Sequence, residues 1–201
     1  MSDKQSEAKI FAPSENQRYS CDLRFSMSQE TYAAGYYHSA KLLVTNVYQN
    51  CALSDTCGPS IAYLYRQFIE LMFKDILRLQ SRLSGCDELE SGHFIDDLWE
   101  KIKKGFDTEF SEYFHEGIEV TERCVTEYTI MDPIGDAFRY ADPNSKKKRP
   151  SKKPPKEPKI AKFREQRSFD VVTLGAQMAT VEYFLSILQG YLQFKLTNSS
   201  Q

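Results

Sequence analysis

The chain has 201 residues, of which 41% are hydrophobic, 13% aromatic and 27% charged. These values are typical of one globular domain and exclude a repeat array, a fibre and a globally disordered chain. A chain of this length buries roughly 70% of the surface that its unfolded form exposes, so it needs no disulfide or metal to fold. No run approaches the roughly 18 apolar residues of a membrane span, and no N-terminal secretion signal is visible.

The formal net charge of −2 conceals two oppositely charged parts. Between positions 146 and 159, eight basic residues face one acidic residue, Glu157, so this basic tract carries +7 and the rest of the chain −9. Its basic residues are Lys146, Lys147, Lys148, Arg149, Lys152, Lys153, Lys156 and Lys159. Such residues bind phosphates without reading sequence, so we expect contact with RNA or another nucleic acid. A targeting signal, an acidic protein partner and docking on the acidic body are the alternatives.

The cysteines indicate the compartment. There are five, an odd number, and the closest pair, Cys51 and Cys57, has neither redox nor zinc-binding spacing. None of the three histidines (His38, His93, His115) has a second metal ligand three or four residues away. We therefore expect free thiols in a reducing cytoplasm, no metal and no cofactor.

Residues 1–27 are polar and aperiodic, which predicts a flexible N-terminal segment. Ser28 is a good N-cap for a first helix and Asp170 for the last one, and Gly35 within the first helix suggests close packing by a neighbour. Pro59 suits the start of a second helix. Helical periodicity predicts five helices, at about 29–49, 60–83, 94–106, 110–131 and 170–197.

Four of the eight prolines lie within the basic tract, and the segment 142–160 that contains the tract precedes the last predicted helix. Such a segment does not fold onto a core and is expected to be extended. The predicted fold is therefore an all-α, antiparallel bundle of about five helices over residues 28–197, interrupted by the insertion 142–160.

Five charged residues follow one another at four-residue steps on the second predicted helix, namely Arg66, Glu70, Lys74, Arg78 and Arg82. Neighbours at this spacing touch, so Glu70 can pair with Arg66 and with Lys74. One interpretation is a solvated face with surface ion pairs. The other is a polar groove inside the bundle, lined by Arg66 and Glu70, because Arg66 adjoins Tyr65 on the apolar edge.

His93 precedes the third predicted helix. It either caps that helix or packs against Trp99, or it serves as a general base or an RNA contact. Arg139, between Phe138 and Tyr140, is either a structural clamp on a carboxylate or a phosphate or base contact. No phosphate-binding loop, Ser-His-Asp pattern or metalloprotease spacing occurs in the sequence.

Three segments occur in an order that resembles helical proteins of the HEPN-like family (higher eukaryotes and prokaryotes nucleotide-binding). They are Tyr65–Lys74, Gly92–Trp99 and Phe138–Tyr140. The resemblance implies a helical bundle, often dimeric, of the kind found in RNA-cleaving toxins of toxin-antitoxin systems, in phage-defence systems and in their non-catalytic relatives.

The chain departs from the catalytic members of that family. These resemble one another in an arginine followed, after four to six residues, by a histidine, and no histidine here has such an arginine; Gln67 stands where relatives often carry histidine. We therefore expect a non-catalytic binding module, a homodimer or complex subunit that associates with RNA or a nucleoprotein, rather than an enzyme. The alternatives are a ribonuclease or toxin with an atypical site built from Arg66, Glu70, His93 and Arg139, and a protein-interaction adaptor.

Overall fold

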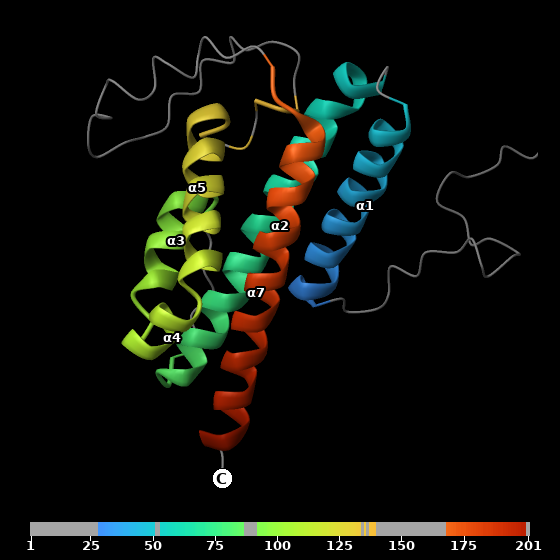
Figure 1. Cartoon of the computed structure of the whole chain (residues 1–201). Coiled ribbons are helices and arrows are strands. Elements are labelled where there is room, and N and C mark those ends of the chain that lie inside the picture. The colour runs from blue at the N-terminus through green and yellow to red at the C-terminus, as the bar shows by residue number, and fades with distance from the viewer. Residues whose placement is uncertain are drawn as a thin grey trace, which may run out of the picture.

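The computed structural model describes residues 28–50, 53–86, 92–133, 135, 137–139 and 168–199. The predicted N-terminal segment, 1–27, and the basic tract lie outside the described residues. What the sequence predicts about them therefore stays a prediction. Figure 1 shows the described part as a bundle of long helices.

The described residues form six helices packed against one another, and the predicted all-α bundle is confirmed. The helices are α1 (Gln29–Gln49), α2 (Ser54–Leu83), α3 (Ile95–Lys103), α4 (Thr108–Tyr113), α5 (His115–Met131) and α7 (Val171–Ser199). Two predicted N-caps are confirmed, since Ser28 accepts a hydrogen bond from the Thr31 amide and Asp170 accepts one from the Thr173 amide.

Helix α2 is the centre of the bundle, with α1, α3 and α7 packed around it (Figure 1). Helices α2 and α7 run in parallel. Near their starts, a Cβ on Gly58 would lie 3.6 Å from Val171, and further along Gln189 hydrogen-bonds Asp75. Helix α1 runs antiparallel to both, and α5 runs antiparallel to α7 (Figure 1).

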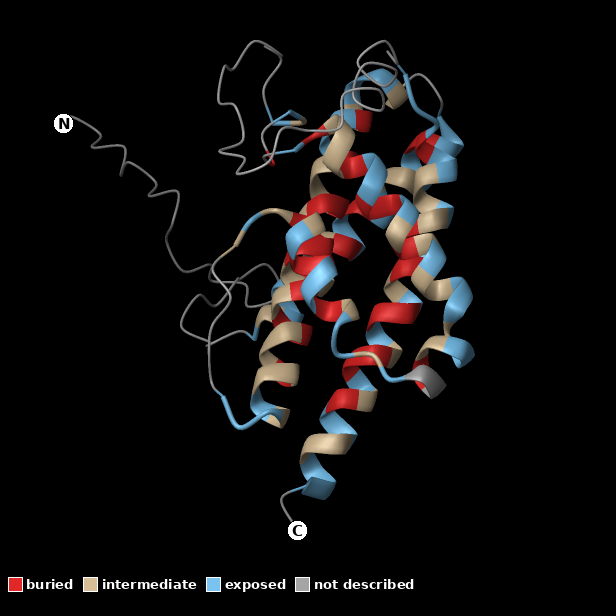
Figure 2. Cartoon of the chain, turned by 90° about the vertical axis from the view of Figure 1, so that its left-hand side faces the viewer, coloured by how far each residue is buried: buried red, intermediate tan, exposed pale blue. Residues whose placement is uncertain are grey.

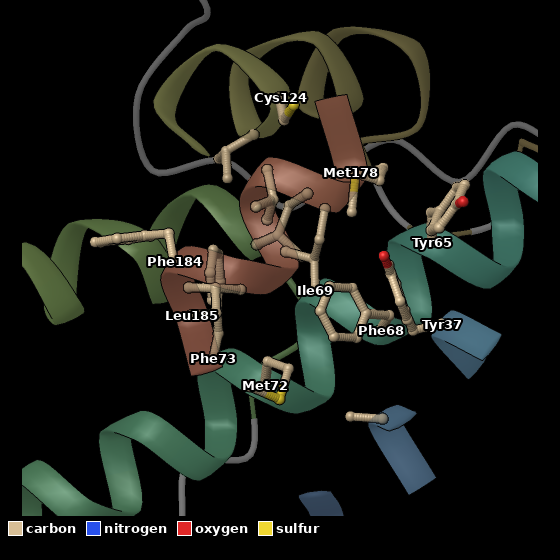
Figure 3. Close-up of a cluster of buried hydrophobic side chains, with 14 of the residues drawn as sticks. Tyr37, Tyr65, Phe68, Ile69, Met72, Phe73, Cys124, Met178, Phe184 and Leu185 are labelled. Atoms are coloured by element: carbon tan, nitrogen blue, oxygen red, sulfur yellow. The ribbon is translucent and has the colours of Figure 1, made fainter. Parts of the chain in front are cut away.

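The hydrophobic core lies between α2 and α7 (Figure 3). Ile69 and Phe73 of α2 and Phe184 and Leu185 of α7 are at most 2% exposed, and Phe68, equally buried, packs against Tyr37 of α1 with ring centroids 5.2 Å apart. Buried residues follow the facing sides of the helices and exposed ones the outer sides (Figure 2). Burial of so many large apolar side chains is the main force that holds the helices together.

The expected start of the second helix at Pro59 is wrong, because α2 begins five residues earlier, at Ser54. A proline this close to a helix start removes a single hydrogen bond, to the carbonyl four residues before it. Packing offsets that loss, since Gly58 is buried against Phe169 and Val171.

The predicted fourth helix is two helices, α4 and α5, separated at Phe114, whose φ of −111° and ψ of 22° are not helical. The break places Phe110 and Phe114 together, with ring centroids 4.7 Å apart, and both rings also approach Phe184. Aromatic packing thus outweighs helical continuity at this position.

By length and composition alone, one described helix, α7, could cross a membrane. The sequence-based expectation that no segment is apolar enough for this is therefore wrong. The central helix of a folded core has the same composition. Eight residues of α7 are buried, among them Met178, Val181 and Leu188, and one side of the helix is therefore committed to the bundle.

The expectation of close packing at Gly35 is also wrong, because Gly35 is exposed and nothing lies within 4 Å of a Cβ built there. We predict that Gly35→Ala raises the free energy of unfolding by about 0.5–1 kcal/mol, since alanine has the higher helix propensity. Urea denaturation followed by circular dichroism measures this.

Gly117 is the matched control in α5, since a Cβ there would lie 2.6 Å from the Phe184 ring. Gly117→Ala should lower stability by about 1–3 kcal/mol through overpacking. Equal effects of the two substitutions would contradict the packing described here.

Candidate functional site

The candidate site is built on the middle of α2. Arg66 is 1% exposed and Glu70 6% exposed, so these two residues face the interior and not a solvated surface. The alternative in which they line a polar region inside the bundle is the correct one. The local reason is the helix face: Ala62, Ile69 and Phe73 lie one or two turns from Arg66 on the same buried side of α2.

The Glu70 carboxylate is the hub of this polar cluster. Its Oε2 accepts a hydrogen bond from Arg66 Nη1 at 2.8 Å. Its Oε1 accepts one from Lys74 Nζ at 2.9 Å and lies 2.8 Å from His93 Nδ1. One carboxylate therefore faces two cations and an imidazole.

The protonation state of Glu70 follows from these contacts. Burial alone would raise the pKa of Glu70, but the hydrogen bonds from Lys74, His93 and Arg66 outweigh burial and hold the pKa below its ordinary value. Glu70 is thus a carboxylate at neutral pH, and because it can only accept hydrogen bonds, His93 Nδ1 carries the hydrogen between them.

The aspartate at the end of α5 completes the surroundings of Arg66. Arg66 Nε lies 3.7 Å from Asp132 Oδ2, and Asp132 Oδ1 accepts a hydrogen bond from the Ala137 amide at 2.8 Å. Asp132 thereby ties the guanidinium to the turn that follows α5.

That turn approaches the guanidinium so closely that a glycine is required. Gly135 has a φ of 79°, and a Cβ there would lie 3.2 Å from Arg66 Cζ. The glycine thus lets the backbone cover the buried guanidinium, which is consistent with a structural role for Arg66.

His93 joins the cluster from the segment before α3. Its backbone oxygen accepts a hydrogen bond from Arg66 Nη2 at 2.9 Å, and its side chain is 73% exposed. Neither sequence-based alternative, a helix cap or packing on Trp99, describes this arrangement. With Nδ1 directed at Glu70, the other ring nitrogen, Nε2, is the one left to act on a ligand.

Arg139 lies on the turn that covers Arg66, and it is exposed. Its guanidinium carbon is 5.8 Å from the centroid of the Tyr63 ring, a cation–π distance. Tyr63 precedes Arg66 by one turn of α2, so Arg139 lies at the outer margin of the cluster. The structure thus brings together Arg66, Glu70 and His93, with Arg139 beside them but on the surface.

Sequence reasoning missed the role of Asp132, whose position before Pro133 predicts only the end of the fourth helix. An Asp-Pro pair after a helix, followed by Gly135, is also typical of a turn in which the aspartate accepts a backbone hydrogen bond. It missed a second buried cluster as well. Asp75, 2% exposed, accepts hydrogen bonds from Arg78 and from Gln189, both at 2.6 Å, and thereby links α2 to α7.

A cavity of about 250 Å³ lies beside the turn, between α5 and the start of α7. Phe138, Phe169 and Cys124 are among its lining residues. Burial raises the pKa of the Cys124 thiol to about 11, so Cys124 is protonated at neutral pH and is not an activated nucleophile. Within the described residues, no group of three or more His, Cys, Asp or Glu side chains is placed to hold a metal ion.

Comparison of the chain with protein-family models, curated proteins and solved structures yields no match. The HEPN-like resemblance therefore stays a prediction from the three sequence segments. In the structure, the first two segments supply Arg66, Glu70 and His93, which contact one another, and the third supplies Arg139, which lies over the Tyr63 ring of α2.

We predict that Glu70→Gln lowers the free energy of unfolding at neutral pH by about 3–5 kcal/mol, because it removes the negative charge that pairs with both Arg66 and Lys74 inside the bundle. Glu70 has a lower pKa in the folded than in the unfolded protein, so the stability it provides is present above pH 4.5 and is lost as the pH falls through the folded-state pKa. The difference between the variant and the unmodified chain should therefore shrink in acid.

Denaturant titrations at several pH values measure this. Glu100→Gln is the matched control, since Glu100 is 63% exposed in a surface ion pair with Lys103 and should change stability by less than about 0.5 kcal/mol. A difference at Glu70 that did not depend on pH would contradict a structural role for its charge.

Proposed function

We propose that the protein is a non-catalytic, HEPN-like binding module that associates with RNA through its basic tract. The observation that carries this proposal is the separation of charge, +7 within residues 146–159 against −9 elsewhere. A −9 body repels a polyanion, so any affinity for RNA must come from the tract and from basic residues beside it.

The described residues on both sides of the insertion support this proposal. The rings of Phe138 and Phe169 lie with their centroids 6.3 Å apart, and Phe138 also contacts Tyr128 at 6.2 Å. The chain thus leaves the bundle and returns to it at one place. Exposed Arg139 lies at that place and is the basic residue of the body best positioned to extend the tract's contact.

The buried cluster supports the non-catalytic part of the proposal. A ribonuclease arginine has to contact the phosphate that it stabilises. Arg66 is 1% exposed, and its Nη1 and Nη2 donate to Glu70 and to the His93 carbonyl. Contact with RNA would require breaking these bonds and moving the turn 132–137, so we assign Arg66 a structural role.

The biological setting follows from the resemblance alone. HEPN-like proteins occur in phage-defence and toxin-antitoxin systems, and we propose a cytoplasmic role of that kind, as a subunit that holds RNA or a nucleoprotein.

We predict that replacing the eight basic residues of the tract by glutamine abolishes most RNA binding. In single-stranded RNA, the slope of log K against log salt is about −0.7 for each neutralised phosphate, so the unmodified chain should show a slope of up to about −5 and the variant one near zero. Fluorescence anisotropy with labelled RNA at several salt concentrations measures both slopes.

A variant with glutamine at Lys41 and Lys104, two exposed lysines of the body, is the control and should keep the slope of the unmodified chain. An unchanged slope in the tract variant would contradict the tract as contact surface. No RNA binding by the unmodified chain would favour the protein-interaction adaptor.

One observation favours an enzyme as the second candidate. His93 is exposed, and its Nδ1 lies 2.8 Å from a carboxylate, the arrangement that orients a histidine for general-base catalysis. In RNA cleavage, Nε2 would take the proton of a 2′-hydroxyl, whose oxygen would attack the adjacent phosphate and displace the 5′-oxygen.

On the non-catalytic account, we expect purified protein to leave labelled RNA intact at neutral pH. If cleavage occurs, His93→Ala decides its origin, with His115→Ala, an exposed histidine of α5, as the control. Cleavage lost in His93→Ala and kept in His115→Ala would replace the binding-module proposal with the atypical ribonuclease.

A further inference from the structure

The outer face of α7 is uncharged from end to end. Of its 29 residues, two are charged, Glu182 and Lys195, and both are only partly exposed. We use the name α7 seam for the exposed residues that recur on one side at steps of three or four, namely Val172, Ala176, Ala179, Tyr183, Ser186, Gly190, Phe194 and Thr197. Residues at these steps form a single stripe along a helix.

The α7 seam exposes unusually large apolar side chains. Tyr183 is 68% exposed and Phe194 66% exposed, whereas nothing lies within 4 Å of a Cβ built on Gly190. Exposed residues of α7 alternate with its buried ones along the lower half of the helix (Figure 2). A long face of this kind is typical of an interaction surface.

We propose that the α7 seam binds the α7 seam of a second copy of this chain, antiparallel about a two-fold axis between residues 186 and 187. The order of large and small side chains along the seam supports this pairing. In that register residue 183 faces residue 190 of the other copy, 194 faces 179, and 197 faces 176. Each of the two rings, Tyr183 and Phe194, thus meets a glycine or an alanine.

This pairing is self-complementary, as a two-fold interface must be. The symmetry presents every contact twice, so both copies place their large side chains on the small residues of the other. The seam carries no charge, and the contact therefore buries no unpaired ion. Small residues also let two helices approach closely.

The area is sufficient for a reversible dimer. A Tyr or Phe side chain contributes about 150–250 Å² when buried, so four rings that are two-thirds exposed provide roughly 400–700 Å². The seam is roughly 38 Å long at about 1.5 Å per residue, and its other residues add to that area. The total approaches the lower end of the range for specific interfaces, about 1,200 Å², near which weak and transient complexes lie.

A lipid surface fits the seam less well. Helices that lie on membranes carry Lys or Arg along their polar face, and anionic lipids repel an acidic protein. The flanks of the seam hold one acidic and one basic residue, Glu182 and Lys195, and the body as a whole is −9.

Sedimentation velocity of the full chain over a concentration range up to about 200 μM tests the proposal, since interfaces at the low end of the size range are weak and need high concentration to form. We expect a monomer–dimer equilibrium. Gly190→Glu should weaken it about 100-fold or more, because each copy would place a carboxylate against the Tyr183 ring of the other. The variant should fold, since Gly190 is exposed in a helix and glutamate has the higher helix propensity.

Gly35→Glu is the matched control, because Gly35 is an exposed helical glycine of α1 with equally open surroundings. It should dimerise like the unmodified chain. A monomeric unmodified chain, or equal dissociation constants for the two glutamate variants, would overturn the proposal. So would dimerisation that appears only after removal of residues 1–27, or a monomer that co-floats with lipid vesicles.

Cross-linking tests the antiparallel register. Ser186→Cys lies beside the two-fold axis and should form a disulfide-linked dimer under mild oxidation. Ala176→Cys should not, because its counterpart would lie roughly 30 Å away along the helices. Native cysteines are common to both variants and to the unmodified control. Equal cross-linking at both positions would indicate a parallel pair and overturn the proposed register.

Discussion

The buried Glu70 carboxylate is the interaction on which the arrangement of this bundle depends. Two cations, Arg66 and Lys74, point at it from its own helix, and each would carry a large desolvation cost without it. Once Glu70 is in place, Arg66 can bind the carbonyl of His93 before α3 and lie beside Asp132 after α5. One ionised side chain therefore fixes three segments that are distant in the sequence.

This dependence separates structural charges from those that can act on a ligand. The charges inside the bundle form ion pairs with one another, Arg66 with Glu70 and Asp132, and Arg78 with Asp75. Within the cluster, the ring of His93 is exposed to solvent. Arg139, at the margin of the cluster, is exposed as well. The proposed RNA contact lies outside the buried cluster, in the tract and in Arg139. The alternative function, an atypical ribonuclease, would use His93.

Much of the fold could be predicted from the sequence because apolar periodicity reports the buried face of a helix directly. Helices α3 and α7 are examples, since they were predicted at about 94–106 and 170–197. The caps Ser28 and Asp170 could be predicted from their side chains. The break at Phe114 and the early start of α2 could not be predicted, because in both cases tertiary packing against Phe184 or Val171 outweighs a local preference. The candidate site was found only in part. Arg66, Glu70 and His93 were singled out, but their burial depends on Asp132 and Gly135, whose positions follow from the turn after α5.

The central claim is that the Arg66–Glu70 cluster is structural and that RNA binds elsewhere. Nuclear magnetic resonance of the isotope-labelled chain during titration with RNA tests this most directly, since arginine side-chain and histidine ring signals report each group separately. We predict that signals of the tract and of Arg139 shift while the Arg66 Nε–H signal stays unchanged. A shift of the Arg66 and His93 signals with an unperturbed tract would contradict the account.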